Sequence, residues 1–216
     1  MGLTSKYRAF IWDFDGTLYD TYPFTVRAYA ELLSERGAVE SAAVIERLAR
    51  ISLGELERYL REKHGVGDDF FSAVAARALE LTLAGAEAFP DAADFVADVA
   101  EAGGMNMLYT HRDENALVML RRGGMARYFA DAVCDGDPDF AWKPAPDAIL
   151  ALVRRNGVSP GEAIMIGDRE IDVLSAANAG IGSALIMPYD ISADTVATYK
   201  CADFAALRAV LGGGDA

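Results

Sequence analysis

Residues 7–17, with the sequence YRAFIWDFDGT, decide the fold that we expect for this chain. The first six are mostly apolar or aromatic and are followed by Asp13, which is typical of a short, buried strand. Asp13 and Asp15 alternate, so along an extended segment their side chains share one face while Phe14 points to the other. Gly16 then permits a sharp turn that would expose backbone amides to an anion. The stretch predicts a buried strand that ends in a polar site.

The segment that follows this strand is expected to be helical. Over residues 22–86 apolar residues recur at helical spacing, and breaks fall near Gly37, Gly54 and Gly65. This pattern predicts about four short helices, which could form a small bundle.

Beyond residue 90, predicted helices and strands alternate along the chain. The predicted strands cover residues 105–109, 132–134, 163–166 and 183–187. The predicted helices cover residues 92–102, 114–122, 146–156, 171–179 and 204–211. Strands that alternate with helices indicate an α/β fold, with a parallel sheet covered by helices on both faces.

Polar side chains follow the ends of these predicted strands. Thr110, His111 and Arg112 come after one strand, Gly167 to Asp172 after another, and Lys143 lies in a loop between them. In parallel sheets, functional residues gather beyond the carboxyl ends of the strands. Asp13, Asp15 and Asp168 would repel one another there unless one is protonated or a cation lies between them, and hard oxygen ligands suit Mg²⁺. Lys143 and Thr110 offer the positive charge and the hydroxyl donor that a phosphoryl group needs.

Together these segments resemble the four motifs of the haloacid dehalogenase-like hydrolases, in the family's order. The carriers of the resemblance are Asp13-Phe14-Asp15-Gly16-Thr17, Thr110, Lys143-Pro144 and Gly167-Asp168 through Asp172. The resemblance extends to the capped phosphatase subgroup, which includes phosphoglycolate phosphatases and sugar-phosphate mutases. It implies a Rossmann-like, three-layer core of residues 1–20 and 87–216, with a small all-helical cap of residues 21–86 inserted after the first strand. It also implies a Mg²⁺-dependent phosphatase that acts through an aspartyl-phosphate.

The resemblance assigns a role to each motif residue. Asp13 would be the nucleophile and a metal ligand. Asp15 would be the general acid and base, with its backbone carbonyl on the metal. Asp168 would be a further metal ligand, and Asp172 would ligate through water or orient Lys143. The residues expected to hold the phosphate are Thr110, His111, Lys143 and Gly16.

The sequence departs from the family pattern after Thr110, because many relatives have asparagine where this chain has His111. We expect this departure to affect the identity of the substrate and not the core chemistry. Arg112 and the turn formed by Ser52, Leu53 and Gly54 are candidates for selecting the substrate.

Simpler structural roles stay open for three of these residues. Asp15 could cap its turn, since Asp-Gly is a common turn pair. Asp172 could be a first-turn acid that complements a helix dipole. Thr110 could cap the helix that follows it.

Two other functions also stay open. A sugar-phosphate mutase of the same family would share Asp13 and Asp15 and return the phosphoryl group to its substrate. A phosphoacceptor signalling domain uses similar residues, but there the paired acids come first and the phosphoacceptor lies on a later strand. In this chain the Asp-x-Asp pair opens the sequence and Gly167-Asp168 completes the site. A helical insert also has no use in such a domain. Haloacid dehalogenation is disfavoured because relatives with that chemistry lack the acids represented here by Asp15 and Asp168.

The composition limits which binding partners and which cellular compartment we expect for this protein. The 216 residues include 20 Lys and Arg against 33 Asp and Glu, a net charge of −13, so nucleic acid and anionic membranes are disfavoured. No apolar run reaches the length of a membrane span. The two cysteines form no disulfide framework. We therefore expect a cytoplasmic enzyme that acts on a small phosphorylated metabolite, with no nucleic acid and no membrane as partner.

Overall fold

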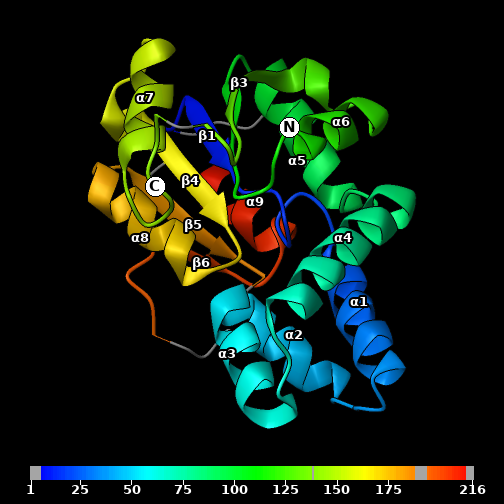
Figure 1. The fold of residues 1–216 in the computed structure, drawn as a ribbon. Coiled ribbons are helices and arrows are strands. Elements are labelled where there is room, and N and C mark those ends of the chain that lie inside the picture. Colours follow the sequence, from blue (N-terminus) through cyan, green and yellow to red (C-terminus); the bar gives the residue numbers. More distant parts are fainter. Residues whose placement is uncertain (1–5, 138, 188–193, 213–216) are drawn as a thin grey trace. The chain divides into compact units, whose positions relative to one another are not determined.

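The structure is a computed structural model that describes residues 6–137, 139–187 and 194–212 (Figure 1). Contacts divide the chain into two units, each with its own hydrophobic core. We call Met1–Tyr19 together with Ala88–Ala216 the core unit, and Asp20–Glu87 the helical unit.

The core unit contains one parallel sheet. Its strands are β1 (Ala9–Trp12), β2 (Met105–Tyr109), β3 (Phe129–Val133), β4 (Ala163–Gly167), β5 (Gly182–Ile186) and β6 (Tyr199–Cys201). Its helices are α5 (Pro90–Glu101), α6 (Asn115–Arg122), α7 (Asp147–Arg155), α8 (Glu170–Ala179) and α9 (Phe204–Gly212). The strand order is β3-β2-β1-β4-β5-β6, with every neighbouring pair parallel. This is the order of a Rossmann-like fold, so the predicted fold class is confirmed.

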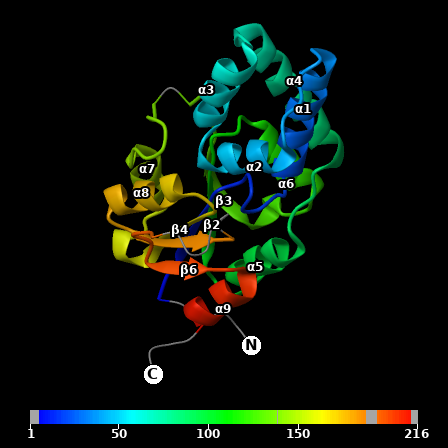
Figure 2. The same cartoon turned by 90° about the horizontal axis from the view of Figure 1, so that it is seen from below.

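Helices cover both faces of this sheet, as Figure 2 shows. Ala9 and Ile11 of β1 face the cluster that includes the buried side chains of α7 and α8. Trp12 faces the opposite side, where its ring lies 5.7 Å from that of Phe95 on α5 and 6.4 Å from that of Phe204 on α9. Because both faces are covered, β1 is buried along its whole length and reads as a continuous apolar run.

The register of the central strands brings their carboxyl ends to one level. Trp12 of β1 pairs with Leu108 of β2 and with Ile166 of β4. The residues that follow each strand therefore emerge at the same edge of the sheet. Asp13 is the first of them on β1, and its N–H donates to the Ile166 carbonyl at 2.9 Å.

The helical unit consists of the four helices expected from the sequence. They are α1 (Tyr22–Glu35), α2 (Ala42–Ile51), α3 (Leu53–His64) and α4 (Asp68–Gly85). Helix α1 packs against α2 and α4, and α2 packs against α3. Leu33, Ile45, Leu56 and Phe70, one from each helix, are fully buried in the shared core of this unit. Its stability comes from this apolar packing, because isolated helices of such lengths are marginal in water.

The main difference from the sequence expectation is strand β6. Three residues paired to β5 alone leave too short an apolar pattern to be recognised in a sequence.

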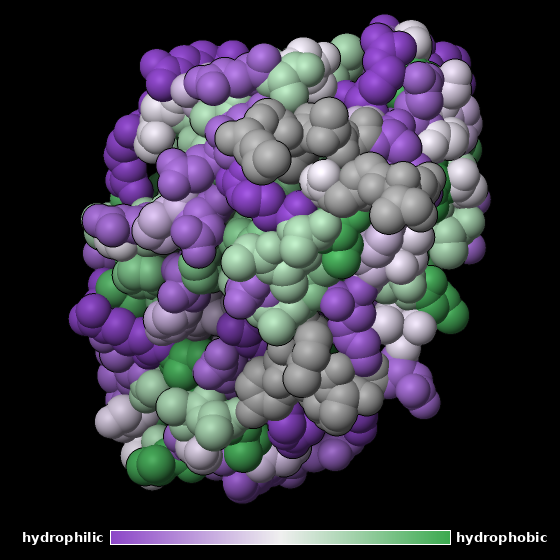
Figure 3. Space-filling model, turned by 180° about the vertical axis from the view of Figure 1, so that it is seen from behind, coloured by the Kyte–Doolittle hydropathy of each residue, from purple (hydrophilic) through white to green (hydrophobic). Residues whose placement is uncertain are grey.

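Cys134 and Cys201 are free thiols. No helix in the described part of the chain is both long and apolar enough to cross a membrane. On the face drawn in Figure 3, hydrophobic residues lie in groups among hydrophilic ones.

Candidate active site

Asp13 lies at the end of β1 and is buried. Its Oδ1 accepts a hydrogen bond from Lys143 Nζ at 2.8 Å. Its Oδ2 is also buried, and no described residue donates to it. Burial and the nearby charge of Asp172 raise the pKa of Asp13 above its usual range, although Lys143 opposes the shift. A buried carboxylate oxygen without a donor is costly, so Oδ2 is suited to face a cation or an electrophile.

Lys143 is the positive centre of the site. Its ammonium is fully buried and donates to Asp13 at 2.8 Å and to Asp172 Oδ1 at 2.7 Å. Burial alone would lower the pKa of Lys143, but attraction and hydrogen bonds from the two carboxylates outweigh it and raise the pKa above its usual value. The ammonium therefore stays charged and fixes both carboxylates.

Asp172 is placed by the turn between β4 and α8. Its Oδ1 accepts from Lys143, and its Oδ2 accepts from the backbone N–H of Arg169 at 3.2 Å. Asp172 thus serves the first turn of α8 and orients Lys143 at the same time. A Cβ added at Gly167 would lie 2.3 Å from Asp172 Cγ, so the end of β4 must be glycine for Asp172 to approach.

We therefore expect Gly167→Ala to damage the site. The added methyl group would displace Asp172 and loosen its grip on Lys143. Overpacking of this kind costs about 1–3 kcal/mol of stability, and a small misplacement of catalytic groups costs about 10²-fold in rate. Thermal unfolding and kcat would measure the two effects.

Gly161→Ala is the matched control, because a Cβ at Gly161 meets nothing within 4 Å. It should leave both quantities within experimental error of the wild type. A Gly167→Ala enzyme with wild-type kcat would contradict the proposed tight contact.

Three buried carboxylates form a group that could hold a metal ion. One ligand oxygen each from Asp13, Asp168 and Asp172 lie within 4.8 Å of one another. Lys143 pairs with Asp13 and Asp172, and Arg169 adds a second positive charge near Asp13. The three carboxylates still outnumber these two cations when all are ionised. Carboxylate oxygens are hard ligands, so this group fits Mg²⁺. The side chain of Asp15 lies outside this group.

Asp15 and Gly16 form a tight turn after β1. Gly16 has a φ of 75°, a left-handed conformation that favours glycine. Its N–H donates to the Tyr19 carbonyl at 2.8 Å. This donor is used within the turn, and the expectation that Gly16 contacts the phosphate stays a prediction. The carboxylate of Asp15 does not cap the turn: both of its oxygens accept from the Arg112 guanidinium.

Thr110 is buried at the end of β2. Its Oγ1 accepts from the backbone N–H of Arg112 at 3.0 Å. The hydroxyl proton is still free to be donated, as phosphate binding requires. The alternative in which Thr110 caps the next helix does not apply, since α6 has Glu114 at its N-cap and no side-chain capping bond there.

His111 has a structural role beside the expected phosphate contact, which stays a prediction. Its Nε2 accepts from the backbone N–H of Lys143 at 3.0 Å, and its ring lies edge-on to Trp142 at 4.6 Å. Burial, and then the positive charge of Lys143 and Arg169, lower the pKa of His111 to about 4. The ring is therefore neutral at pH 7 and fixes the backbone of Lys143 through Nε2, while the other ring nitrogen carries the proton and can donate.

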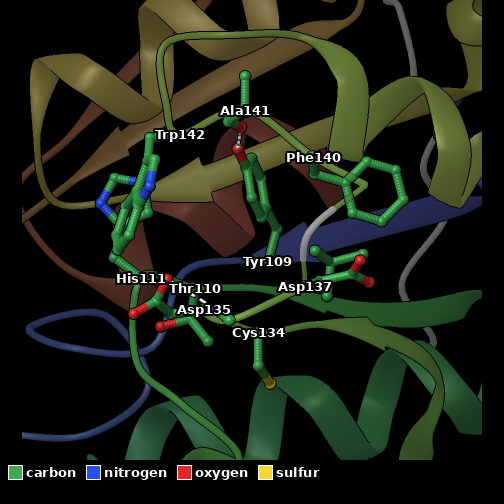
Figure 4. Close-up of a pocket in the computed structure, with 11 residues that line it drawn as sticks. Tyr109, Thr110, His111, Cys134, Asp135, Asp137, Phe140, Ala141 and Trp142 are labelled. Carbon is green, nitrogen blue, oxygen red and sulfur yellow. Dashed lines mark hydrogen bonds between the residues drawn. The ribbon is translucent and has the colours of Figure 1, made fainter.

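A pocket of about 330 Å³ adjoins Thr110 and His111. Residues after β2 and β3 line it together with the segment before α7, and Figure 4 shows Tyr109 between Phe140 and the neighbouring His111 and Trp142. The Tyr109 hydroxyl points to the Ala141 carbonyl at 3.5 Å. The sequence pointed to only the Thr110 and His111 side of this pocket, because the residues that follow β3 carry no recognisable pattern.

The three candidate residues of the helical unit lie where α2 meets α3. Ser52 caps α3, since its Oγ accepts from Glu55 N–H at 3.0 Å. Leu53 is half exposed, and Gly54 is in the first turn of α3. The Ser52 hydroxyl thus has a structural role that the sequence analysis did not assign.

The chain is similar to known proteins over most of its length. The family model of the haloacid dehalogenase-like hydrolases matches residues 7–180. The phosphoglycolate phosphatase of Rhodospirillum rubrum is 31% identical over a gapped alignment of 228 positions, which covers 96% of this chain and 94% of that protein. The fructose-1-phosphate phosphatase YqaB of Escherichia coli is 27% identical, covering 82% of this chain and 94% of that protein.

Solved structures show the same fold. A haloacid dehalogenase-family hydrolase from Deinococcus radiodurans, with bound phosphate and sodium, superposes with a TM-score of 0.79. It is 18% identical, and the alignment covers 96% of both chains.

Proposed function

The chain belongs to the haloacid dehalogenase-like hydrolases and is a phosphatase of this family, and we propose that it hydrolyses a small phosphate monoester. In this proposal the reaction requires Mg²⁺ and passes through an aspartyl-phosphate on Asp13. The observation that carries the proposal is the state of Asp13. Lys143 fixes one of its oxygens, and no described residue donates to the other. A carboxylate held in this way is a competent nucleophile towards phosphorus when nearby positive charge offsets the charge of the ester.

The proposed reaction has two steps on this chain's residues. Asp13 Oδ2 attacks phosphorus, the ester bond breaks, and Asp15 gives a proton to the leaving oxygen. Water then attacks the phosphorus of the acyl phosphate while Asp15 takes the proton, which releases phosphate and restores Asp13. Thr110 and Lys143 hold the phosphoryl oxygens during both steps.

Asp13, Asp168 and Asp172, with the backbone carbonyl of Asp15, are the groups that would hold Mg²⁺. Bound Mg²⁺ supplies positive charge that offsets the repulsion between the carboxylates and the anionic ester. Unit charges about 4 Å apart interact by roughly 4 kcal/mol at an effective dielectric of 20, so this repulsion is large on the scale of binding energies.

We further propose that the helical unit acts as a cap that excludes water and selects the ester. Ser52, Leu53 and Gly54 are its candidate specificity residues, and Arg112 is the candidate in the core unit. Phosphoglycolate is the first ester to test, because the phosphatase of R. rubrum is named for it. We expect the enzyme to act in the cytoplasm.

The test is phosphate release from a panel of metabolite monoesters. We expect release with Mg²⁺, at least a 10²-fold loss after exhaustive chelation, and recovery when Mg²⁺ is restored. Ca²⁺ should restore little, because its larger and looser shell tolerates a bidentate Asp13, which would lose its attacking oxygen.

Two outcomes would contradict the proposal. Undiminished turnover after chelation would show that the reaction does not require a metal ion. Conversion of a sugar phosphate into its isomer without phosphate release would instead identify a mutase.

A further inference from the structure

The ion pair between Arg112 and Asp15 is not explained by the reaction above. Arg112 Nε lies 3.1 and 3.2 Å from the two carboxylate oxygens, and Nη2 lies 2.6 Å from Oδ1. The Arg112 side chain keeps only 15% of its exposure and that of Asp15 keeps 29%. The guanidinium also lies over the ring of Phe14, 5.7 Å from its centroid. This is a forked, well-packed contact and not a loose surface pair.

This ion pair is incompatible with the proposed proton transfer by Asp15. To exchange a proton with the leaving oxygen, Asp15 must turn one of its oxygens towards it. In this structure both oxygens accept from the same guanidinium. The contact therefore has to loosen during the reaction. Removing one partner from a largely buried charge pair is costly, unless another charge replaces it.

The backbone of Arg112 is fixed, so only its side chain needs to move. The N–H of Arg112 donates to Thr110 Oγ1 at 3.0 Å, and its carbonyl accepts from the Asp135 N–H at 2.9 Å. The Arg112 guanidinium lies beside Asp15, the acid that is proposed to protonate the leaving oxygen. An anion on the leaving group would thus be within reach of the guanidinium, whereas the transferred phosphoryl group is already served by Lys143 and Thr110.

We infer that Arg112 is a specificity-determining residue that exchanges Asp15 for a carboxylate on the alcohol part of the substrate. The inference rests on the proposed phosphatase function and deepens it. A carboxylate matches the planar fork of a guanidinium, as the carboxylate of Asp15 already does. Binding of such an ester both satisfies Arg112 and frees Asp15 for proton transfer. Esters of neutral alcohols leave the ion pair intact and are poor substrates.

Two esters with the same skeleton test this inference. 2-Phosphoglycolate carries the carboxylate, and 2-hydroxyethyl phosphate has a neutral hydroxymethyl group in its place. We expect the wild-type enzyme to have the higher kcat/KM for 2-phosphoglycolate. Hydrogen bonds to charged groups correspond to a discrimination of about 10- to 100-fold, and Arg112→Met should reduce the ratio of the two kcat/KM values by about this factor.

Further variants separate recognition from structure. Arg112→Lys keeps the charge but loses the fork, so its ratio should fall between those of the wild type and Arg112→Met. Arg154→Met removes an arginine from the exposed last turn of α7 and should leave the ratio at the wild-type value. If Arg112→Met does not fold, the Arg112→Lys ratio decides.

The inference is overturned if the wild-type enzyme does not prefer 2-phosphoglycolate, or if the Arg112 variants keep the wild-type ratio. Arg112 would then be only a structural partner of Asp15. This failure is distinct from failure of the proposed function. In the first case other esters still release phosphate with Mg²⁺, and in the second case no ester does.

Discussion

Asp13→Asn is expected to lose about 10⁴- to 10⁶-fold in kcat, the scale measured when one member of a catalytic triad is removed. The carboxamide has almost the same shape as the carboxylate, but it cannot attack phosphorus. It also removes the anion that faces Lys143, at 2.8 Å in the wild type. The fold should survive, because Lys143 keeps Asp172 as a partner at 2.7 Å. Phosphate release measures the loss of kcat, and thermal unfolding shows whether the fold survives.

Two further measurements make this prediction specific. Protein quenched with acid during turnover should contain no covalently bound phosphate in the Asp13→Asn variant. Asp91→Asn makes the same chemical change on an exposed residue in the first turn of α5 and should keep wild-type activity. If Asp13→Asn retained more than a hundredth of the wild-type rate, another group would have to be the nucleophile.

The sheet and the positions of the motif residues could be predicted because their signals are local. A fully buried parallel strand is a short apolar run, and β1 and β4 read in this way. Parallel strands in register end at one edge, so residues that directly follow β1, β2 and β4 must lie near one another. Strand β3 was expected at 132–134 but spans Phe129–Val133, because only its last residue is fully buried.

The side-chain pairs within the site could not be predicted. Arg112 and Asp15 are 97 positions apart, and no pattern in the sequence couples them. The bond from the Lys143 backbone to His111 likewise depends on how two loops meet in space. His111 thus fixes the backbone of Lys143, and the Gly16 N–H closes its own turn, which no local pattern predicts.

Gly167 is an intermediate case. Its place between an apolar strand and an acidic turn suggests a need for a small residue. The reason is the approach of Asp172, which only the coordinates show. A glycine at a strand end is therefore a sign of close contact, but the sequence does not name the contacting group.

Asp15→Asn is expected to separate the two steps of the reaction. General acid–base catalysis contributes about 10²- to 10⁴-fold, and asparagine cannot exchange the proton. An aryl phosphate with a good leaving group needs little protonation, so Asp13 should still be phosphorylated. The second step needs a base for the attacking water, and it should become slow. The variant should therefore give a burst of aryl alcohol close to one equivalent of enzyme, followed by a slow steady rate.

The matching chemical signature is phosphate bound to Asp13 that is stable to acid and labile to base. Asparagine also removes the anionic partner of Arg112, so loss of the ion pair must be distinguished from loss of proton transfer. Arg112→Met removes the same pair but keeps the Asp15 carboxylate, and it should not accumulate phosphorylated protein. Asp15→Asn should accumulate it because only this variant lacks the base. Turnover of the aryl phosphate by Asp15→Asn at the wild-type steady rate would show that Asp15 is not the base, and the proton would have to leave the attacking water by another route.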